Sequence, residues 1–528
     1  MTRKLDGLLA SVGVLFGASS LAWPFGWDTS VHYYVGREWL LRGAIPYRDA
    51  FDHKTPGIHL VHALAIAVFG EGMWGIRLVE LASIVVLGWA SAEIARDRAS
   101  RPVPGLRGAA VLAASVLYYG FFDYWNTAQC ELLATTCASL MVLAALRVRS
   151  LPRAGAVAGL LAGVAFSLKP PFLLFALVAL AVLWRRRPRR GFVRPLVAFF
   201  AGASVVPGLL LAYFAAHGAL GDLVEVVGSA NAVYLENEPR LDSLTAVVDN
   251  AVVVWRGYSP VAGWLFAASG IAVAAAFVRG ARRRLGRWAL AAGMLALGYA
   301  VIAVQLKFYY YHWIAELSAG TLMTANLIVD AAAAMRAARR PWVPVLVSVV
   351  LLEAFAQTGP QASAWLRATE ATVHWVRGDW DRGRFAGAFQ TWDGVRRYAD
   401  VEATGLWLRE HSRPGDELLV RGVAAEIYVV SGLHAPGRFF WTTFLTRPSR
   451  RFHREAWLAE DAAVIDAKKP RWVVTWTETR EGPESESYFL PRGYVERTRI
   501  GPYTVLERGR QSPAPASSAA GAGAGGGL

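Results

Sequence analysis

The chain has 528 residues, of which 55% are hydrophobic and 18% charged, and its 55 Lys plus Arg against 40 Asp plus Glu give a net charge of +15. A soluble domain carries about 25% charged residues and no long apolar runs, so an ordinary soluble or disordered chain is excluded. The basic residues separate apolar segments and do not line one aromatic-rich face, which argues against nucleic-acid binding. The composition predicts a polytopic α-helical membrane protein.

Apolar runs and basic clusters alternate along the first two thirds of the chain. A span needs about 20 mostly apolar residues, and Lys and Arg gather in short cytoplasmic loops. The basic clusters are Arg3/Lys4, Arg96–Arg107, Arg147–Arg153, Arg185–Arg194, Arg279–Arg287 and Arg336–Arg340. Two apolar runs lie between each neighbouring pair of clusters, which predicts about eleven spans with the amino terminus inside.

One apolar segment, residues 58–70, is an exception because its length of about 13 residues is too short for an ordinary span. Counting it as a span would place Arg3 and Lys4 on the opposite side from the other basic loops. We therefore expect a non-spanning juxtamembrane helix inside a first outer loop over residues 27–72. Residues 5–23 are expected to form a span and not a cleaved signal peptide, because Trp23-Pro24 makes a poor cleavage site.

The composition becomes polar after the last expected span. The sequence predicts a transmembrane domain over residues 1–357, a Trp/Arg-rich interfacial connector over 358–397, a small α/β domain over 398–510 and a disordered tail over 511–528. The elements expected in the α/β domain are helices at 401–411, 424–431 and 456–468, strands at 417–421 and 471–476, and a hairpin at 494–500 and 503–508.

The first outer loop concentrates charged residues and rigid turns. Asp28 follows the first span, Tyr47 lies within the stretch Gly43–Asp49, and Asp52-His53-Lys54-Thr55-Pro56 precedes the short apolar helix. An acid and cations at the lipid boundary suit a substrate that has a lipid tail and a charged head.

These residues resemble motifs of the GT-C superfamily of integral membrane glycosyltransferases, especially the protein-mannosyltransferase and aminoarabinose-transferase type. That type carries an Asp just past the first span, a Gly-x-x-Tyr-x-Asp-like stretch and a Lys-Pro-Pro-like turn, and Asp28, Gly43–Asp49 and Lys54-Thr55-Pro56 are similar in order and spacing. The stretch Asn126–Glu131 is similar to a family pattern that supplies an acid. The chain departs from the family at Thr29, where a Glu is frequent, and at Thr55, where a second Pro is frequent.

The resemblance implies transfer of a hexose or pentose, with inversion, from a polyprenyl-phosphate donor to a glycan, lipid or protein acceptor. It also implies a location in the inner membrane of a bacterium, among membrane lipids, with the amino terminus cytoplasmic and the carboxyl-terminal domain periplasmic. Asp28 is the expected general base, a role that contributes about 10² to 10⁴ in rate, and Glu131 is expected to orient the acceptor or share its proton. The expected substrate-binding residues, including cations that stabilise the departing phosphate, are Asp52, His53, Lys54, Tyr47, Lys169, Lys307 and His312.

Each of these residues also has a purely structural interpretation. The lysines could extend towards lipid headgroups, Glu131 could stabilise a helix amino terminus, and His312 could belong to an interfacial aromatic belt. His59 and His62 are three residues apart, but no third ligand follows at a suitable spacing. Neither a metal nor a cofactor is therefore assigned, and the involvement of a divalent cation is left open.

Two other functions are compatible with a polytopic chain. A transporter or flippase is favoured by the many spans and opposed by the lack of a clear half-repeat, by the absence of acids deep within spans and by the bulky outer domain. A non-catalytic envelope scaffold is the third possibility. Replacing Asp28 by Asn separates these functions, because only the transferase needs a base there.

Overall fold

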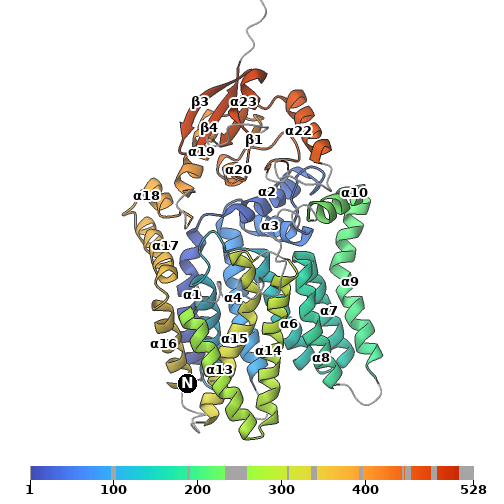
Figure 1. The fold of residues 1–528 in the computed structure, drawn as a ribbon, viewed down its shortest axis with the longest axis vertical. Coiled ribbons are helices and arrows are strands. Elements are labelled where there is room, and N and C mark those ends of the chain that lie inside the picture. The colour runs from blue at the N-terminus through green and yellow to red at the C-terminus, as the bar shows by residue number, and fades with distance from the viewer. Residues whose placement is uncertain are drawn as a thin grey trace, which may run out of the picture.

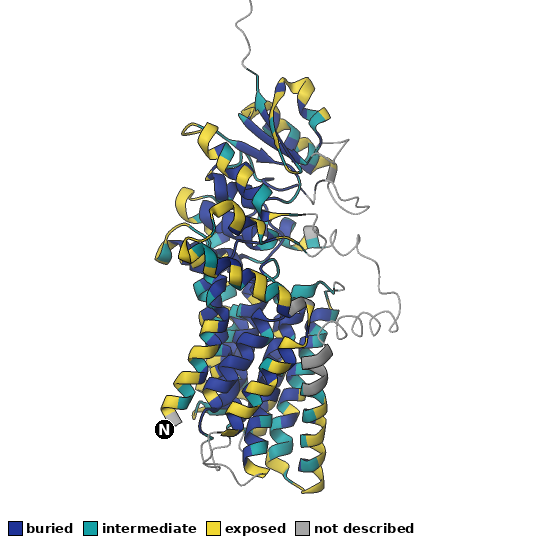
Figure 2. Ribbon diagram, turned by 90° about the vertical axis from the view of Figure 1, so that its left-hand side faces the viewer, coloured by how far each residue is buried: buried dark blue, intermediate teal, exposed yellow. Residues whose placement is uncertain are grey.

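The computed structural model describes residues 2–96, 103–186, 191–231, 259–305, 308–334, 342–391, 396–442, 445, 454–476 and 484–509. A helical bundle forms one end of the molecule, and a small α/β domain forms the other (Figure 1). The interior of the bundle is buried, whereas many outward-facing residues are exposed (Figure 2). The expected disordered tail, residues 511–528, lies outside the described residues.

The bundle contains helices of two lengths. Within the described ranges, seven are long and apolar enough to cross a membrane: Arg3–Ala22 (α1, Thr2–Ala18, with η1, Ser19–Ala22), α4 (Trp74–Ala95), α6 (Cys130–Arg147), α7 (Leu151–Leu168), α9 (Val193–Ala216), α14 (Arg282–Ala303), and Tyr310–Ala334 (η4, Tyr310–Glu316, with α15, Leu317–Ala334). Shorter apolar helices are α3 (Pro56–Phe69), α5 (Leu106–Tyr119), Leu265–Val278 within α13 (Ser259–Val278), and α16 (Trp342–Ala356). Between α7 and α9 the chain forms η2 (Pro170–Phe175) and α8 (Ala176–Arg186). The polytopic helical fold is confirmed, and the number of spans stays a prediction.

Two helices lie across the end of the bundle, beneath the α/β domain (Figure 1). They are α2 (Trp27–Arg42) and α3, which contains the short apolar segment identified in the sequence. The 14 residues of α3 extend about 21 Å, less than the roughly 30 Å of a bilayer core. Gly43 ends α2 in the left-handed conformation that glycine adopts without strain.

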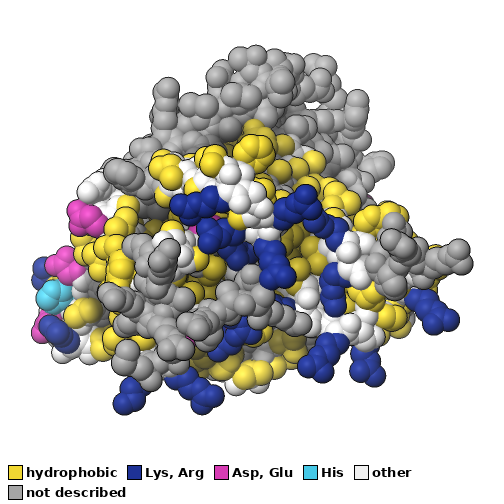
Figure 3. Space-filling model, turned by 90° about the horizontal axis from the view of Figure 1, so that it is seen from below, with side chains coloured by type: hydrophobic (Ala, Val, Ile, Leu, Met, Phe, Trp, Pro, Cys, Tyr) yellow, Lys and Arg dark blue, Asp and Glu magenta, His cyan; other side chains and the backbone are white. Residues whose placement is uncertain are grey.

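The basic clusters gather at the opposite end of the bundle, which also holds the amino terminus (Figures 1 and 3). Asp6 in α1 accepts a hydrogen bond from the backbone N–H of Arg107 at 3.0 Å, and the Arg107 side chain donates to Glu93 of α4 at 2.8 Å. Arg186 donates to the carbonyl of Val148 at 2.8 Å. Loops that the sequence assigns to one membrane face therefore meet in space, while Arg336–Arg340 lies outside the described residues.

The connector and the α/β domain follow α16. The connector contains α17 (Pro360–Arg377) and α18 (Arg382–Gly387), and the domain contains α19 (Tyr398–His411), β1 (Leu418–Val420), α20 (Glu426–Ser431), α22 (Arg454–Lys468), β2 (Trp472–Trp476), α23 (Glu486–Phe489), β3 (Tyr494–Ile500) and β4 (Tyr503–Arg508). The sheet order is β1-β2-β4-β3, with β1 and β2 parallel and the other pairs antiparallel. Each helix and strand that the sequence predicted here is present.

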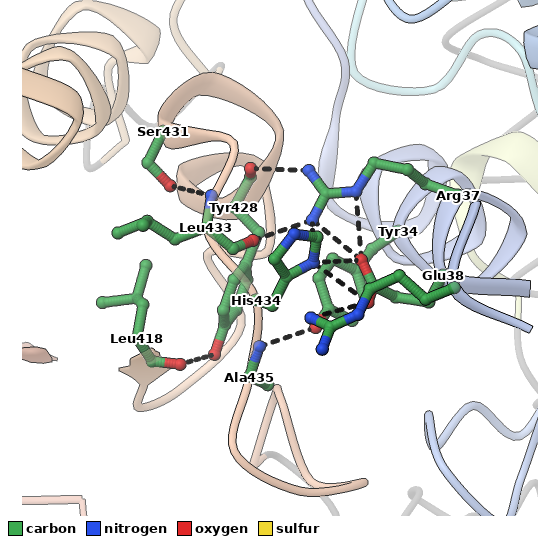
Figure 4. Close-up of polar contacts among 10 residues, drawn as sticks. Tyr34, Arg37, Glu38, Leu418, Tyr428, Ser431, Leu433, His434 and Ala435 are labelled. Atoms are coloured by element: carbon green, nitrogen blue, oxygen red, sulfur yellow. Dashed lines mark hydrogen bonds and ion pairs between the residues drawn. The ribbon is translucent and has the colours of Figure 1, made fainter. Parts of the chain in front are cut away.

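The α/β domain is fixed to α2 by a buried polar cluster (Figure 4). The Arg37 guanidinium donates hydrogen bonds to the backbone carbonyls of Tyr428 and Leu433 at 3.2 and 2.7 Å, and it pairs with Glu38 at 2.9 Å. His434 lies 2.8 Å from the Glu38 carboxylate. Because a buried charge without partners is costly, these contacts hold the domain in one position relative to α2.

Candidate active site

Two carboxylates identified in the sequence each lie at the amino-terminal end of a helix. Asp28 occupies the first turn of α2, and Glu131 the first turn of α6. Acids are favoured at these positions because the helix dipole places partial positive charge there. Lys169 directly follows the carboxyl-terminal end of α7, where the dipole favours a cation. The two acids and the lysine therefore each lie at the helix end whose dipole favours their charge.

Asp28 pairs with Lys54, which comes from the loop between α2 and α3. The Lys54 Nζ lies 3.7 Å from the Asp28 carboxylate and 3.1 Å from His53 Nε2. The Asp28 side chain is 28% exposed, so a substrate can reach it, whereas Lys54 is nearly buried. Burial opposes ionisation of Asp28, but Lys54 and then His53 outweigh it, so the pKa of Asp28 lies below its ordinary value. Asp28 is therefore ionised at neutral pH, as a proton acceptor must be.

Glu131 pairs with Lys169 in the same way. The two side chains form a direct ion pair, and His312 Nε2 lies 3.9 Å from the Glu131 carboxylate. The Lys169 ammonium also lies 5.6 Å from the centre of the Tyr311 ring. The pKa of Asp28 is lowered by Lys169 as well as by Lys54, and that of Lys54 is raised by Glu131 as well as by Asp28. The two pairs therefore form one electrostatic unit.

Two glycines allow the segments that carry these pairs to approach closely. A Cβ on Gly26, just before α2, would lie 2.5 Å from the carbonyl oxygen of Trp125 in the loop before α6. A Cβ on Gly57, in the first turn of α3, would lie 2.4 Å from the carbonyl oxygen of Ser167, two residues before Lys169. Only a residue without a side chain permits these backbone contacts.

Replacing Gly57 by Ala is expected to damage the site through this contact. Overpacking against a backbone carbonyl costs about 1–3 kcal/mol of stability. Separating the Lys54 loop from Lys169 by about 1 Å would lower turnover by roughly 10²-fold. Thermal unfolding and turnover measure the two effects. Gly208→Ala is the matched control, because nothing lies within 4 Å of its added Cβ; equal behaviour of the two variants would contradict this packing argument.

Asp52, two residues before Lys54, lies among three histidines from α2, α3 and the loop between them. Its carboxylate is 3.2 Å from His53 Nδ1, 3.4 Å from His59 Nε2 and 3.8 Å from His32 Nε2. Burial lowers the pKa of His59 to about 4 against the opposing effect of Asp52, so its imidazole is neutral at physiological pH. In the part of the chain that the structure describes, no group of three or more His, Cys, Asp or Glu side chains is arranged to hold a metal ion.

Tyr47 fixes the backbone of the same loop. Its hydroxyl donates to the carbonyl oxygen of Lys54 at 2.9 Å, and its side chain is fully buried. Its φ of 73° is unusual for a residue with a side chain, so the tertiary contacts must hold it there. Tyr47 thus holds the backbone of Lys54 in place.

The structure brings together Asp28, Asp52, His53, Lys54, Glu131, Lys169 and His312, with Tyr47 behind them. Lys307 lies outside the described residues. Arg77 was not identified in the sequence, although it is fully buried and donates to the carbonyl of Pro24 and to the Thr127 hydroxyl, both at 2.6 Å. It therefore ties the segment before Asp28 to the segment before Glu131. The feature of the sequence that could have identified Arg77 is a single cation at the start of apolar α4, followed by Glu80 on the same face of the helix.

Comparisons with known proteins give a family match over part of the chain and a fold match over nearly all of it. A family model described as dolichyl-phosphate-mannose-protein mannosyltransferase matches residues 53–212. No curated protein sequence matches the chain at a significant level. Among solved structures, ArnT from Cupriavidus metallidurans bound to undecaprenyl phosphate is similar, with a TM-score of 0.57, 13% identity, and coverage of 97% of this chain and 100% of that chain. Its apo form gives a TM-score of 0.55 and 12% identity, with 95% and 97% of the two chains covered.

The family match includes Lys54, Glu131 and Lys169, and the structural similarity extends over nearly the whole chain, including the α/β domain. At this level of identity, the solved structures establish the fold. The resemblance to GT-C membrane glycosyltransferases is thereby confirmed, because residues 53–212 match a mannosyltransferase family model and nearly the whole chain shares the fold of ArnT.

Proposed function

We propose that the chain transfers a sugar from a polyprenyl-phosphate donor to an acceptor on the outer, periplasmic face of a bacterial inner membrane, with inversion at the anomeric carbon. The observation that carries this proposal is the pairing of two carboxylates with two lysines at the end of the bundle opposite the basic clusters. The undecaprenyl phosphate bound by the similar ArnT and the dolichyl-phosphate-mannose description of the family support the donor class.

The proposed reaction is a single displacement. The acceptor hydroxyl attacks the anomeric carbon, Asp28 accepts its proton, and the bond from that carbon to the phosphate oxygen breaks. Polyprenyl phosphate leaves with the bonding electrons. Attack from the face opposite the leaving phosphate inverts the configuration.

Lys54 and Lys169 would hold the departing phosphate. The negative charge on the phosphate grows as the bond breaks, so both cations stabilise the transition state more than the ground state. Each lysine is already paired with a carboxylate, and the second carboxylate, Glu131, would orient the acceptor or share its proton. Asp52, His53 and Tyr47 would keep Lys54 in place, and His312 would assist from the Glu131 side.

The test uses the purified chain in lipid nanodiscs with a panel of labelled polyprenyl-phosphate hexoses and pentoses. A membrane extract supplies glycan, lipid and protein acceptors. The proposal predicts a labelled glycoconjugate together with released polyprenyl phosphate. Liposomes that contain the chain are assayed in parallel for movement of the intact donor across the bilayer. Such movement without any glycosyl product would support a flippase and contradict the proposal.

The proposed orientation predicts which introduced cysteines react from outside the cell. In a background where Cys130 and Cys137 are replaced by Ser, Arg48→Cys before α3 and Glu410→Cys on α19 should react with an impermeant maleimide in intact cells. Arg153→Cys, at the basic end of α7, should react only after the membrane is permeabilised. All three positions are exposed, so burial does not prevent labelling. The opposite pattern would reverse the orientation and contradict the outer-face site.

A further inference from the structure

The first turn of α20 brings a carboxyl group from the α/β domain towards the first turn of α2. Glu426 begins α20, and α20 packs on α2 through the Arg37 contacts and the rings of Tyr34 and Tyr428, whose centres are 4.8 Å apart. The same helix, α2, carries Asp28 in its first turn. Docking of the domain on α2 therefore also fixes the position of Glu426 relative to Asp28.

Glu426 is buried, and one of its oxygens lacks a hydrogen-bond partner. The residue is 1% exposed, and among the described residues no group hydrogen-bonds to its Oε2. The groups that interact electrostatically with its carboxyl are Asp28 and Ser30 of α2, the Arg396 guanidinium before α19, and Tyr124, Tyr398 and Tyr503. The Tyr124 hydroxyl, in the loop before α6, is also buried without a partner in the described part of the chain. Buried polar atoms usually have partners, so both groups have hydrogen-bonding capacity left for a further partner.

The surroundings of Glu426 give it the properties of a hydrogen-bond donor. Burial, followed by the charge of Asp28, raises its pKa to about 8 against the opposing effects of Arg396 and Ser30. Its carboxyl group is therefore mostly protonated at neutral pH and can donate a hydrogen bond, whereas the ionised Asp28 can only accept one. Two carboxyl groups with different pKa values and neighbouring positions are suited to different roles on one substrate.

We propose that Glu426 binds an oxygen atom of the acceptor next to the hydroxyl group that Asp28 deprotonates, so that the α/β domain completes the acceptor site. This inference rests on the proposed transferase function. The acceptor class that fits is a neutral, hydroxyl-rich group such as a sugar ring, which offers adjacent oxygens to one donor and one base. The donor phosphate binds separately, at Lys54 and Lys169.

The test compares Glu426→Ala and Glu426→Gln with the wild-type chain in the nanodisc assay. An amide still donates a hydrogen bond, so Glu426→Gln should keep most of the activity at pH 7. Glu426→Ala should lower kcat/KM for the acceptor by roughly tenfold to a hundredfold, because a buried polar contact to the substrate is lost. Affinity for polyprenyl phosphate should be unchanged in both variants.

The pH profile separates a binding role from a purely structural one. Wild-type kcat/KM should fall as the pH rises past about 8, because the ionised Glu426 no longer donates and repels Asp28. Glu426→Gln should lose this alkaline decrease. Glu410→Gln, an exposed change of the same kind on α19, should behave like the wild type.

Two results would overturn the inference while leaving the proposed function intact. One is unchanged acceptor kinetics in Glu426→Ala, and the other is an alkaline decrease that persists in Glu426→Gln. A wild-type chain that forms no glycosyl product would instead reject the proposed function itself. Unfolding temperature and polyprenyl-phosphate affinity show whether each variant is folded, and Glu426→Gln keeps the test decisive if Glu426→Ala is unstable.

Discussion

Asp28→Asn is expected to abolish most sugar transfer while leaving the chain folded and able to bind the donor. The amide keeps the shape of the side chain but cannot accept the acceptor proton, and loss of a positioned general base costs about 10² to 10⁴ in rate. Removing this charge also leaves Lys54 with one fewer carboxylate nearby, so affinity for an anionic phosphate should be unchanged or higher. The measurements are kcat and polyprenyl-phosphate affinity in nanodiscs.

Glu71→Gln is the control for this variant, because it removes one exposed carboxylate from the loop between α3 and α4. It should retain wild-type turnover. If Asp28→Asn also kept wild-type turnover, the assignment of Asp28 as the base would be wrong. If both variants lost expression, the effect would lie in folding and not in chemistry.

Lys54→Met is expected to reduce both donor binding and turnover. The ammonium pairs with Asp28 and also interacts electrostatically with Asp52. Losing one electrostatic stabiliser of a developing charge costs about 10² to 10³ in kcat. Without Lys54 the main group that lowers the pKa of Asp28 is gone, so this pKa rises. Activity below neutral pH should therefore begin to fall at a higher pH than in the wild type, since Asp28 must be ionised to act.

Arg48→Met tests whether any positive charge in this loop supports donor binding and turnover, or only that of Lys54. Arg48 is 45% exposed, pairs with Asp49 and donates to the carbonyl of His217 at the end of α9, so its loss should change turnover less than twofold. Lys54→Arg should recover part of the donor affinity, because it restores the charge with a different shape. A Lys54→Met variant with wild-type donor affinity, whose activity also falls at the same acidic pH as the wild type, would exclude Lys54 from the phosphate site.

The fold was largely predictable because its signals are local. The short apolar run at residues 58–70 predicted a short helix, which is α3, and alternating helix and strand patterns predicted the elements of the α/β domain. Helix α2 was not identified as a helix, because it is buried between the bundle and the α/β domain and lacks the two-faced pattern of a surface helix. Its buried Arg37 and Glu38 appear in the sequence as ordinary loop charges.

The site was predictable only in part. Asp28, Lys54 and Glu131 stand in short motifs, and the structure places them together. The pairing of Glu131 with Lys169 joins residues 38 positions apart, and Arg77 and Glu426 interact with residues still further away in the sequence. A local pattern can single out such a residue, but it does not identify the distant residue that it contacts, because burial and packing decide the pairing. The close contacts at Gly26 and Gly57 likewise become visible only when the opposing backbone is known.

The most direct measurement is the configuration of the transferred sugar. A polyprenyl-phosphate sugar labelled with ¹³C at its anomeric carbon is incubated with the purified chain and acceptor, and the product is examined by NMR. Direct attack by a hydroxyl deprotonated at Asp28 predicts a product of inverted configuration, formed in a one-to-one ratio with released polyprenyl phosphate. Retained configuration, or passage of the intact labelled donor across the bilayer with no new glycosidic bond, would contradict this account.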